Sequence, residues 1–175
     1  MLDLIQNVTR MMGVDANRKE VFRMKKCEDV GEVESFEAFI EGSGIGFDVE
    51  QYNREQMNDK LCNGMYARVL FIREGDFLTG RIHKEPYIDI FVSGEVKLIS
   101  YLEDGTVEPM EVIDSLRILE GKPGRKRVLE AVKDTVWITV DRFDLADDIG
   151  KVRRYGTFRW MSEYSEFAKK LKESV

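Results

Sequence analysis

The sequence predicts a mainly β domain, a barrel or two-sheet sandwich, with a helical segment before it and an amphipathic helix after it. Residues 65–140 contain about eight β-rich runs at intervals of roughly eight to twelve residues, which is typical of all-β folds. Turn-forming sequences separate several of these runs. At both ends of the chain, apolar residues recur at helical spacing instead.

The β-rich runs follow one another without long helical segments between them. They are Tyr66–Ile72, Leu78–Ile82, Tyr87–Val92, Glu95–Tyr101, Val107–Val112, Leu116–Leu119, Lys126–Val132 and Thr135–Val140. Ser93-Gly94 and Glu103-Asp104-Gly105 lie between runs and have the composition of hairpin turns. Because strands do not alternate with helices, we expect antiparallel pairing and no doubly wound parallel sheet.

Residues 1–63 are predicted to form a mostly helical N-terminal extension. Leu2, Ile5, Val8 and Met12 recur at helical spacing near the start of the chain. A second helix is expected to begin at Asp48, with Gln51 completing a capping box, and to run through about Leu61.

The barrel is assigned to residues 64–142, and residues 143–175 to a linker and a C-terminal amphipathic helix. Trp160, Tyr164, Phe167 and Leu171 form one apolar stripe of that helix, and Ser162 is its expected N-cap. We interpret the stripe as a docking face that packs on the barrel or on a neighbouring subunit.

Composition excludes several classes of protein. The 175 residues are 43% hydrophobic and 34% charged, with a net charge of −6, so no general nucleic-acid binding is expected. No apolar run reaches the roughly 20 residues of a membrane span, and the first residues lack the pattern of a signal peptide. We therefore expect folding in a cytoplasm and no membrane partner.

The segment from Gly75 to Gly94 contains His83, the single histidine of the chain. This segment resembles the first motif of the cupin family, which places two histidines and a glutamate on adjacent strands inside a jelly-roll barrel. By that resemblance His83 matches the first histidine and Glu85 stands in place of the second. Tyr87 falls at the position of the glutamate, with Asp89 two residues beyond.

The segment from Gly121 to Arg127 resembles the second cupin motif, and Arg127 takes the place of its histidine. A guanidinium stays protonated near neutral pH and cannot bind a metal. His83, Glu85 and Asp89 still form a chemically acceptable set of ligands for a divalent metal. We expect no cofactor, with a metal at these three residues as the alternative.

The same residues can instead form a polar cluster that needs no metal. Arg127 can pair with Glu85 or Asp89 inside the barrel or at its mouth, and His83 and Tyr87 can join by hydrogen bonds. A buried charge needs partners of this kind, since an unpaired one costs several kcal/mol.

A functional variant of this cluster is an anion-binding pocket. Arg125, Lys126 and Arg127 follow one another, and arginine offers a fork that fits carboxylate or phosphate. Tyr87 is the fourth residue that we assign to this candidate ligand site.

Other catalytic constellations are absent from the sequence. One histidine excludes most two-histidine sites, and no Gly-x-Ser-x-Gly elbow occurs. We assign no catalytic residues and expect a protein that is not an enzyme.

Several short segments in residues 64–140 resemble a group of uncharacterised cupin-like proteins of tailed-phage genomes. The segments are Gly64-Met65-Tyr66-Ala67-Arg68, Leu78-Thr79-Gly80, Ile82-His83-Lys84, Ser93-Gly94-Glu95 and Asp134–Val140. The resemblance covers a little under half of the chain. It implies a β-barrel and a phage setting.

Together these observations favour a non-catalytic structural or interaction protein, a phage virion or virion-assembly component built on a cupin barrel with a degenerate metal site. Its expected partners are further copies of itself or other virion proteins. It would be made in the host cytoplasm and could be incorporated in the virion. The alternative is a small-molecule protein, either a metal-dependent cupin enzyme using His83 or a metal-free anion pocket around Arg127.

Overall fold

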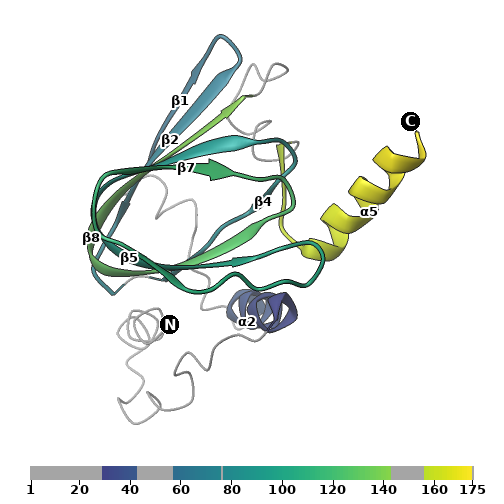
Figure 1. The fold of residues 1–175 in the computed structure, drawn as a ribbon, viewed down its shortest axis with the longest axis horizontal. Helices are drawn as coiled ribbons and strands as arrows, with labels where there is room; N and C mark the ends of the chain where they lie inside the picture. Colours follow the sequence, from purple (N-terminus) through teal and green to yellow (C-terminus); the bar gives the residue numbers. More distant parts are fainter. Residues whose placement is uncertain (1–28, 43–56, 76, 143–155, 175) are drawn as a thin grey trace.

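A computed structural model describes residues 29–42, 57–75, 77–142 and 156–174 of the protein. Strands dominate the described part, as Figure 1 shows. In chain order the elements are α2 (Val30–Gly42), β1 (Met57–Cys62), β2 (Met65–Ile72), β3 (Phe77–Thr79), β4 (Ile82–His83), β5 (Tyr87–Tyr101), β6 (Glu111–Ile113), β7 (Arg117–Gly121), β8 (Lys126–Arg142), β9 (Thr157–Phe158) and α5 (Met161–Glu173).

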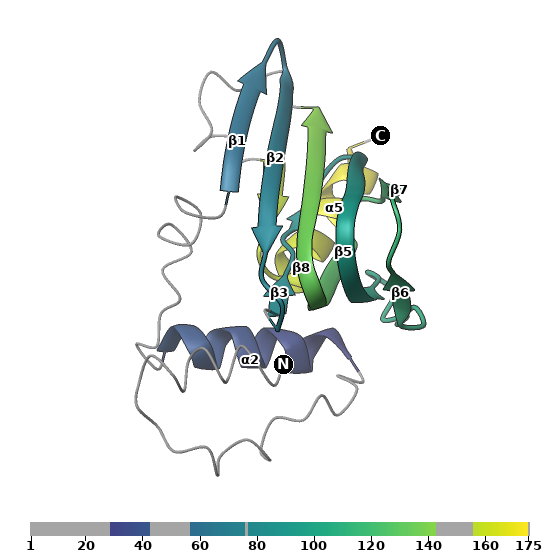
Figure 2. The same ribbon diagram turned by 90° about the vertical axis from the view of Figure 1, so that its left-hand side faces the viewer.

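The long strands β5 and β8 organise the barrel. They pair antiparallel along almost their whole length and bend, so that each contributes one half to each of two layers. The first layer has the order β1-β2-β8-β5-β7 and the second has β3-β8-β5-β6. Figure 2 shows β1, β2, β8 and β5 side by side. This arrangement confirms the predicted mainly β class and the jelly-roll barrel.

A bend in β5 replaces one of the two turns that the sequence predicts. Ser93-Gly94 is not a hairpin turn, because β5 continues through it with register shifts between Phe91 and Val96. Gly94 has a φ of +111°, and a Cβ there would lie 2.2 Å from Thr135 Oγ1. A glycine at this bulge therefore lets β5 bend closely against β8. The turn at Glu103–Gly105 does form, with the backbone N–H of Leu102 donating to the Thr106 carbonyl at 2.9 Å.

The helix predicted from Asp48 through about Leu61 is wrong at its end, because residues 57–62 form β1. A two-residue loop, Asn63-Gly64, joins β1 to β2, and both residues have positive φ, 47° and 76°. Asn-Gly is the preferred sequence for a loop of this kind. The β-sheet therefore begins before residue 64, the predicted start of the barrel.

The apolar core lies between the two layers. Ile72, Phe91, Val96, Leu98, Ile113, Ala131 and Trp137 are its fully buried members. They come from β2, β5, β6 and β8, and the ring of Phe91 meets that of Trp137 edge to face at 6.1 Å.

A second apolar cluster attaches α5 to the barrel. Met161, Tyr164 and Ala168 of α5 pack with Ile82 of β4. The helix begins at Met161 with Trp160 as its N-cap, so Ser162 is not the cap. The backbone N–H of Trp160 donates to Glu163 Oε2 at 3.2 Å instead.

The predicted stripe on α5 packs on its own chain over its first turns. Leu171, at its far end, is exposed and does not belong to the packed face. In Figure 1 the C-terminal end of α5 projects away from the barrel, while α2 lies beneath the barrel.

Three predictions fall wholly or partly outside the described residues. These are the helical stripe Leu2, Ile5, Val8 and Met12, the start of the helix predicted from Asp48, and the linker predicted from residue 143. Within the described ranges, no helix is long and apolar enough to cross a lipid bilayer.

Candidate functional site

The barrel interior is polar where β5 begins and β8 ends. Side chains alternate along a strand, so Tyr87 and Asp89 of β5 point inward together with Trp137, Thr139 and Asp141 of β8. Asp89 is 3% exposed. Charged groups held this far from water need partners.

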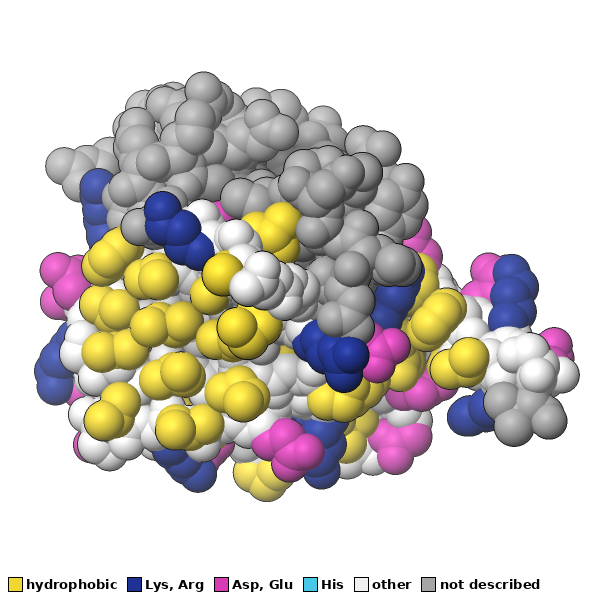
Figure 3. Space-filling model, turned by 90° about the horizontal axis from the view of Figure 1, so that it is seen from above, with side chains coloured by type: hydrophobic (Ala, Val, Ile, Leu, Met, Phe, Trp, Pro, Cys, Tyr) yellow, Lys and Arg dark blue, Asp and Glu magenta, His cyan; other side chains and the backbone are white. Residues whose placement is uncertain are grey.

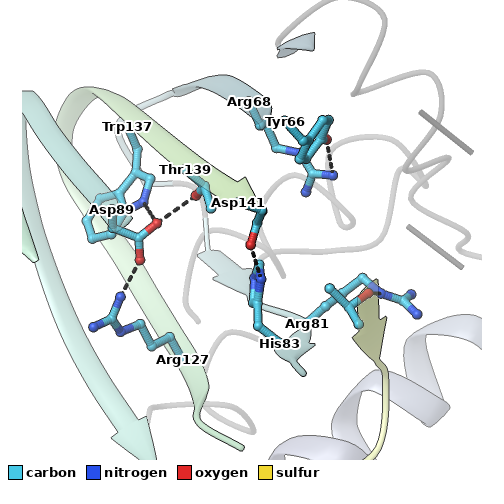
Figure 4. Close-up of polar contacts among 10 residues, drawn as sticks. Tyr66, Arg68, Arg81, His83, Asp89, Arg127, Trp137, Thr139 and Asp141 are labelled. Atoms are coloured by element: carbon cyan, nitrogen blue, oxygen red, sulfur yellow. Dashed lines mark hydrogen bonds and ion pairs between the residues drawn. The ribbon is translucent and has the colours of Figure 1, made fainter. Parts of the chain in front are cut away.

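Asp89 has three partners, drawn in Figure 4. Its Oδ2 accepts from Nη1 of Arg127, which forms a buried ion pair. Its Oδ1 accepts from Nε1 of Trp137 at 2.9 Å and from Oγ1 of Thr139 at 2.6 Å. Of the two acidic partners predicted for Arg127, the structure brings Asp89 to it, and the carboxylate is fully engaged.

Arg127 retains a donor that no described residue accepts. Nη2 donates to the Glu120 carbonyl at 3.1 Å. Arg125 donates through Nη2 to Glu108 Oε1 at 3.1 Å. Both arginines are 8% exposed, and the Nε of each is buried without a hydrogen-bond partner among the described residues.

Tyr87 forms an aromatic wall beside this pair. Its ring centre lies 5.8 Å from the guanidinium carbon of Arg127 and 3.8 Å from the ring of His83, which stacks on it. Burial, followed by the charge of Asp89, raises the pKa of the Tyr87 phenol far above its usual range. Gly121 allows the close approach of β7, since a Cβ there would lie 2.3 Å from the Tyr87 ring.

His83 is held from β4. Its Nδ1 hydrogen-bonds to Asp141 Oδ1 at 2.7 Å, as Figure 4 shows. Instead of the predicted hydrogen bonds to the Arg127–Asp89 ion pair, His83 bonds to Asp141 of β8, and its ring stacks on that of Tyr87.

Lys126 belongs to the other side of β8. Because it is adjacent to Arg127 in a strand, it points away from the interior. Its ammonium is 1% exposed and lies 3.0 Å from Glu37 Oε2 of α2 and 3.1 Å from the Arg159 carbonyl. The structure therefore does not place Lys126 with Arg125 and Arg127, and its ion pair instead connects α2 to the barrel.

The three candidate metal ligands are not brought together. Glu85 is exposed, Asp89 is engaged by Arg127, and His83 is paired with Asp141. Across the part of the chain that the structure describes, no three His, Cys, Asp or Glu side chains are grouped to hold a metal ion.

Sequence reasoning missed Trp137, Thr139 and Asp141. A signal was present, because these three residues alternate with Ile138 and Val140 and so share one face of the strand. Trp137 and Thr139 donate to Asp89, whereas the buried Nε groups of Arg125 and Arg127 have no acceptor among the described residues, and such donors suit an acceptor oxygen.

Comparison with known proteins finds similar folds among solved structures. No family model matches the sequence, and no curated protein is similar to it at a significant level.

Solved structures are similar to about half of the chain. A formate complex of oxalate decarboxylase from Lactobacillus farciminis has a TM-score of 0.43 and 10% identity, covering 53% of this chain and 32% of that one. Hydroxypropylphosphonic acid epoxidase from S. wedmorenis has a TM-score of 0.41 and 10% identity, with 49% of each chain covered. A conserved protein of unknown function from Streptococcus pyogenes has a TM-score of 0.40 and 12% identity, covering 53% and 79%. The chain spans about a third of the first and about half of the second. These likenesses concern the fold alone.

Proposed function

We propose that the protein is a non-catalytic binding protein whose barrel interior takes a small ligand through a carboxylate or phosphate oxygen. The observation that carries the proposal is the pair of buried arginines, Arg125 and Arg127, each with a buried Nε–H that no described residue accepts. A buried donor without a partner costs about 1–3 kcal/mol. An acceptor oxygen supplied by a ligand would remove that cost.

The charges around the two arginines define the kind of ligand. Each guanidinium already faces one acid, Arg127 facing Asp89 and Arg125 facing Glu108. The two ion pairs therefore leave no net positive charge at these arginines, and affinity would come from hydrogen bonds to the unused donors. We expect binding to depend weakly on salt, unlike binding to an exposed cluster of basic residues.

Tyr87 supplies the apolar contact of the proposed site. Its ring faces Arg127 on one side and stacks on His83. An aromatic surface next to convergent donors is the usual composition of a small-molecule site.

Thermal unfolding with a panel of anions tests this proposal. Acetate, oxalate, phosphate and sulfate are compared with chloride at equal ionic strength, and a ligand at ten times its Kd should stabilise the protein by about 1.4 kcal/mol. Arg125→Met should remove much of the stabilisation. This variant is preferred because the Glu108 side chain that it leaves behind is 36% exposed and remains solvated.

Arg117→Met is the matched control, since Arg117 pairs with Glu111 at the surface. It should leave the stabilisation unchanged. If none of the anions stabilises the protein, or if both variants respond alike, the proposed pocket is wrong.

The metal-dependent alternative fits the residues less well. Asp89 already accepts hydrogen bonds at both oxygens, and Glu85 lies at the surface. We derive no reaction step through a metal. Stoichiometric iron, manganese, nickel or zinc in purified protein, lost in His83→Ala, would overturn this conclusion.

A structural or interaction function in a phage particle is a second proposal. It is supported by apolar side chains that remain exposed on the outer face of the first layer, among them Ile88, Phe71 and Ile118. The phage setting and synthesis in a host cytoplasm stay predictions from the resemblance. Co-sedimentation of the purified protein with phage particles would support this function, and its absence in every particle tested would remove it.

A further inference from the structure

The outer face of the first layer is largely apolar. Antiparallel sheets that face water on one side usually place apolar residues inward and polar residues outward. Here Asp89, Thr139 and Asp141 face the interior, whereas their neighbours Ile88 and Ile138 face outward. An apolar outer face is unusual for a surface in contact with water.

The strand register aligns these outward residues into rows. One row crosses four strands as Ile118, Ile90, Ile138 and Val69. The next row crosses five strands, with Glu120 and Lys60 at its two ends and Ile88, Val140 and Ala67 between them. Phe71 and Val136 are paired in a third row. Figure 3 shows hydrophobic side chains gathered on one side of the molecule.

Exposure confirms that described residues leave the face uncovered. Ile118 is 71% exposed and Ile88 47%. In the middle of the sheet, Ile90 and Ile138 are partly buried between these neighbours. We call the three rows the outer apolar face.

The outer apolar face is large enough to hold a partner. Five strands about 4.8 Å apart and three rows about 6.8 Å apart, with their side chains, cover on the order of 400 Å² per copy. Since the accessible area of side chains exceeds the projected area, two such faces approach the ~1,000 Å² of a specific interface.

We propose that a second copy of the chain packs on this face, layer against layer, around a two-fold axis parallel to the strands. Such an axis keeps the rows aligned and brings the β7 edge of one copy over the β1 edge of the other. Glu120 of one protomer then meets Lys60 of its partner, and the same pair forms at the opposite edge. Isoleucines meet isoleucines in between.

The charges at the rim select this axis. A two-fold axis in the plane of the sheet but perpendicular to the strands would stack equal edges, with Glu120 near Glu120 and Lys60 near Lys60. Like charges at both edges oppose that arrangement, whereas the first places opposite charges there. The resulting dimer is a four-layered assembly whose ligand sites stay inside the two barrels.

Sedimentation velocity over a range of protein concentrations tests the proposal. The full chain should be dimeric in the micromolar range, and Ile118→Glu should raise the dimer Kd by at least about tenfold. Leu171→Glu is the matched control, because Leu171 is an exposed apolar residue of α5, 56% exposed, outside this face. Far-UV circular dichroism verifies that both variants fold.

A charge exchange tests the axis. Lys60→Glu and Glu120→Lys should each weaken the dimer several-fold, and the double variant should restore it, since both rim pairs regain opposite charges. A protein that is monomeric throughout, or a dimer insensitive to Ile118→Glu, overturns the proposed interface. A dimer that Ile118→Glu disrupts but that the double charge variant does not restore overturns the axis. Binding of another protein or of lipid vesicles to the monomer through this face would also overturn the proposal of a second copy.

Discussion

Removing the charge of Arg127 should be among the most damaging single substitutions in the barrel. Arg127→Met keeps much of the side-chain volume but leaves Asp89 without its cation. Asp89 is 3% exposed and Arg127 8%, so solvent compensates poorly for the lost partner. The carboxylate would keep only the hydrogen bonds from Trp137 and Thr139.

The size of the effect follows from this burial. Breaking a buried pair from one side typically costs about 3–5 kcal/mol, because it leaves an uncompensated charge. Asp89→Asn should cost a similar amount, since it leaves the Arg127 guanidinium buried. The double variant carries no charge at these two positions and can keep the acceptor for Trp137 and Thr139. We therefore expect it to lose only about 1–2 kcal/mol.

Urea unfolding at neutral pH, followed by far-UV circular dichroism, measures these differences. Lys97→Met is the control, because the Lys97 side chain is 38% exposed in its pair with Glu130 and should cost no more than about 1 kcal/mol. Two results would refute the reasoning. One is a loss below about 1 kcal/mol for Arg127→Met, and the other is a double variant whose loss equals the sum of the single losses.

Three further predictions concern the surroundings of the pair. Gly121→Ala should lower the free energy of unfolding by about 1–3 kcal/mol, because its Cβ would lie 2.3 Å from the buried Tyr87 ring. Gly105→Ala, which meets no atom within 4 Å but has a φ of +84°, should cost only about 1 kcal/mol, and the opposite order in thermal unfolding would contradict the packing. Lys126→Met should leave Glu37 without its cation and expose α2 to limited proteolysis before the barrel is cut, whereas an unchanged cleavage pattern would mean that this ion pair does not hold α2. Burial holds the pKa of Tyr87 above its unfolded value of about 10, so the native state binds more protons and stability falls as pH rises beyond about 10. Tyr87→Phe should reduce that alkaline loss by up to about 1.4 kcal/mol per pH unit, and an equal loss in both proteins would place the phenol in water.

The barrel could be predicted from the sequence because apolar residues along its strands either alternate with polar ones or follow one another without interruption. It also limited the acidic partner of Arg127 to Glu85 or Asp89. Which of them pairs depends on the register between β5 and β8, which places Asp89 opposite Thr139. That register arises from the tertiary fold and is not visible in local sequence.

Two errors have a local physical cause. Ser93-Gly94 has the composition of a turn, but here the glycine serves a bulge at the bend of a long strand. Asn63-Gly64 is a strong hairpin signal, yet the predicted helix extends to about Leu61, just before it. The strand before it, residues 57–62, has few β-branched or aromatic residues and is defined by its pairing with β2.

The grouping of Arg125, Lys126 and Arg127 shows another limit of composition. Three consecutive basic residues suggested one pocket, yet alternation along β8 sends Lys126 to the opposite face. The same alternation places Thr139 and Asp141, which the sequence analysis did not assign to the site, on the inward face of β8. Strand periodicity was thus a better guide to this site than the likeness to a motif.

The indole N–H signal of Trp137 tests directly whether an anion enters the barrel interior beside Arg127. The chain has two tryptophans, so a nitrogen–proton correlation spectrum resolves two indole signals. Trp137 donates to Asp89, the partner of Arg127, whereas Trp160 caps α5. Titration with acetate, oxalate, phosphate or sulfate should shift the Trp137 signal saturably and leave that of Trp160 in place. If neither signal moves with any of these anions, or if both move together, the proposed site is contradicted.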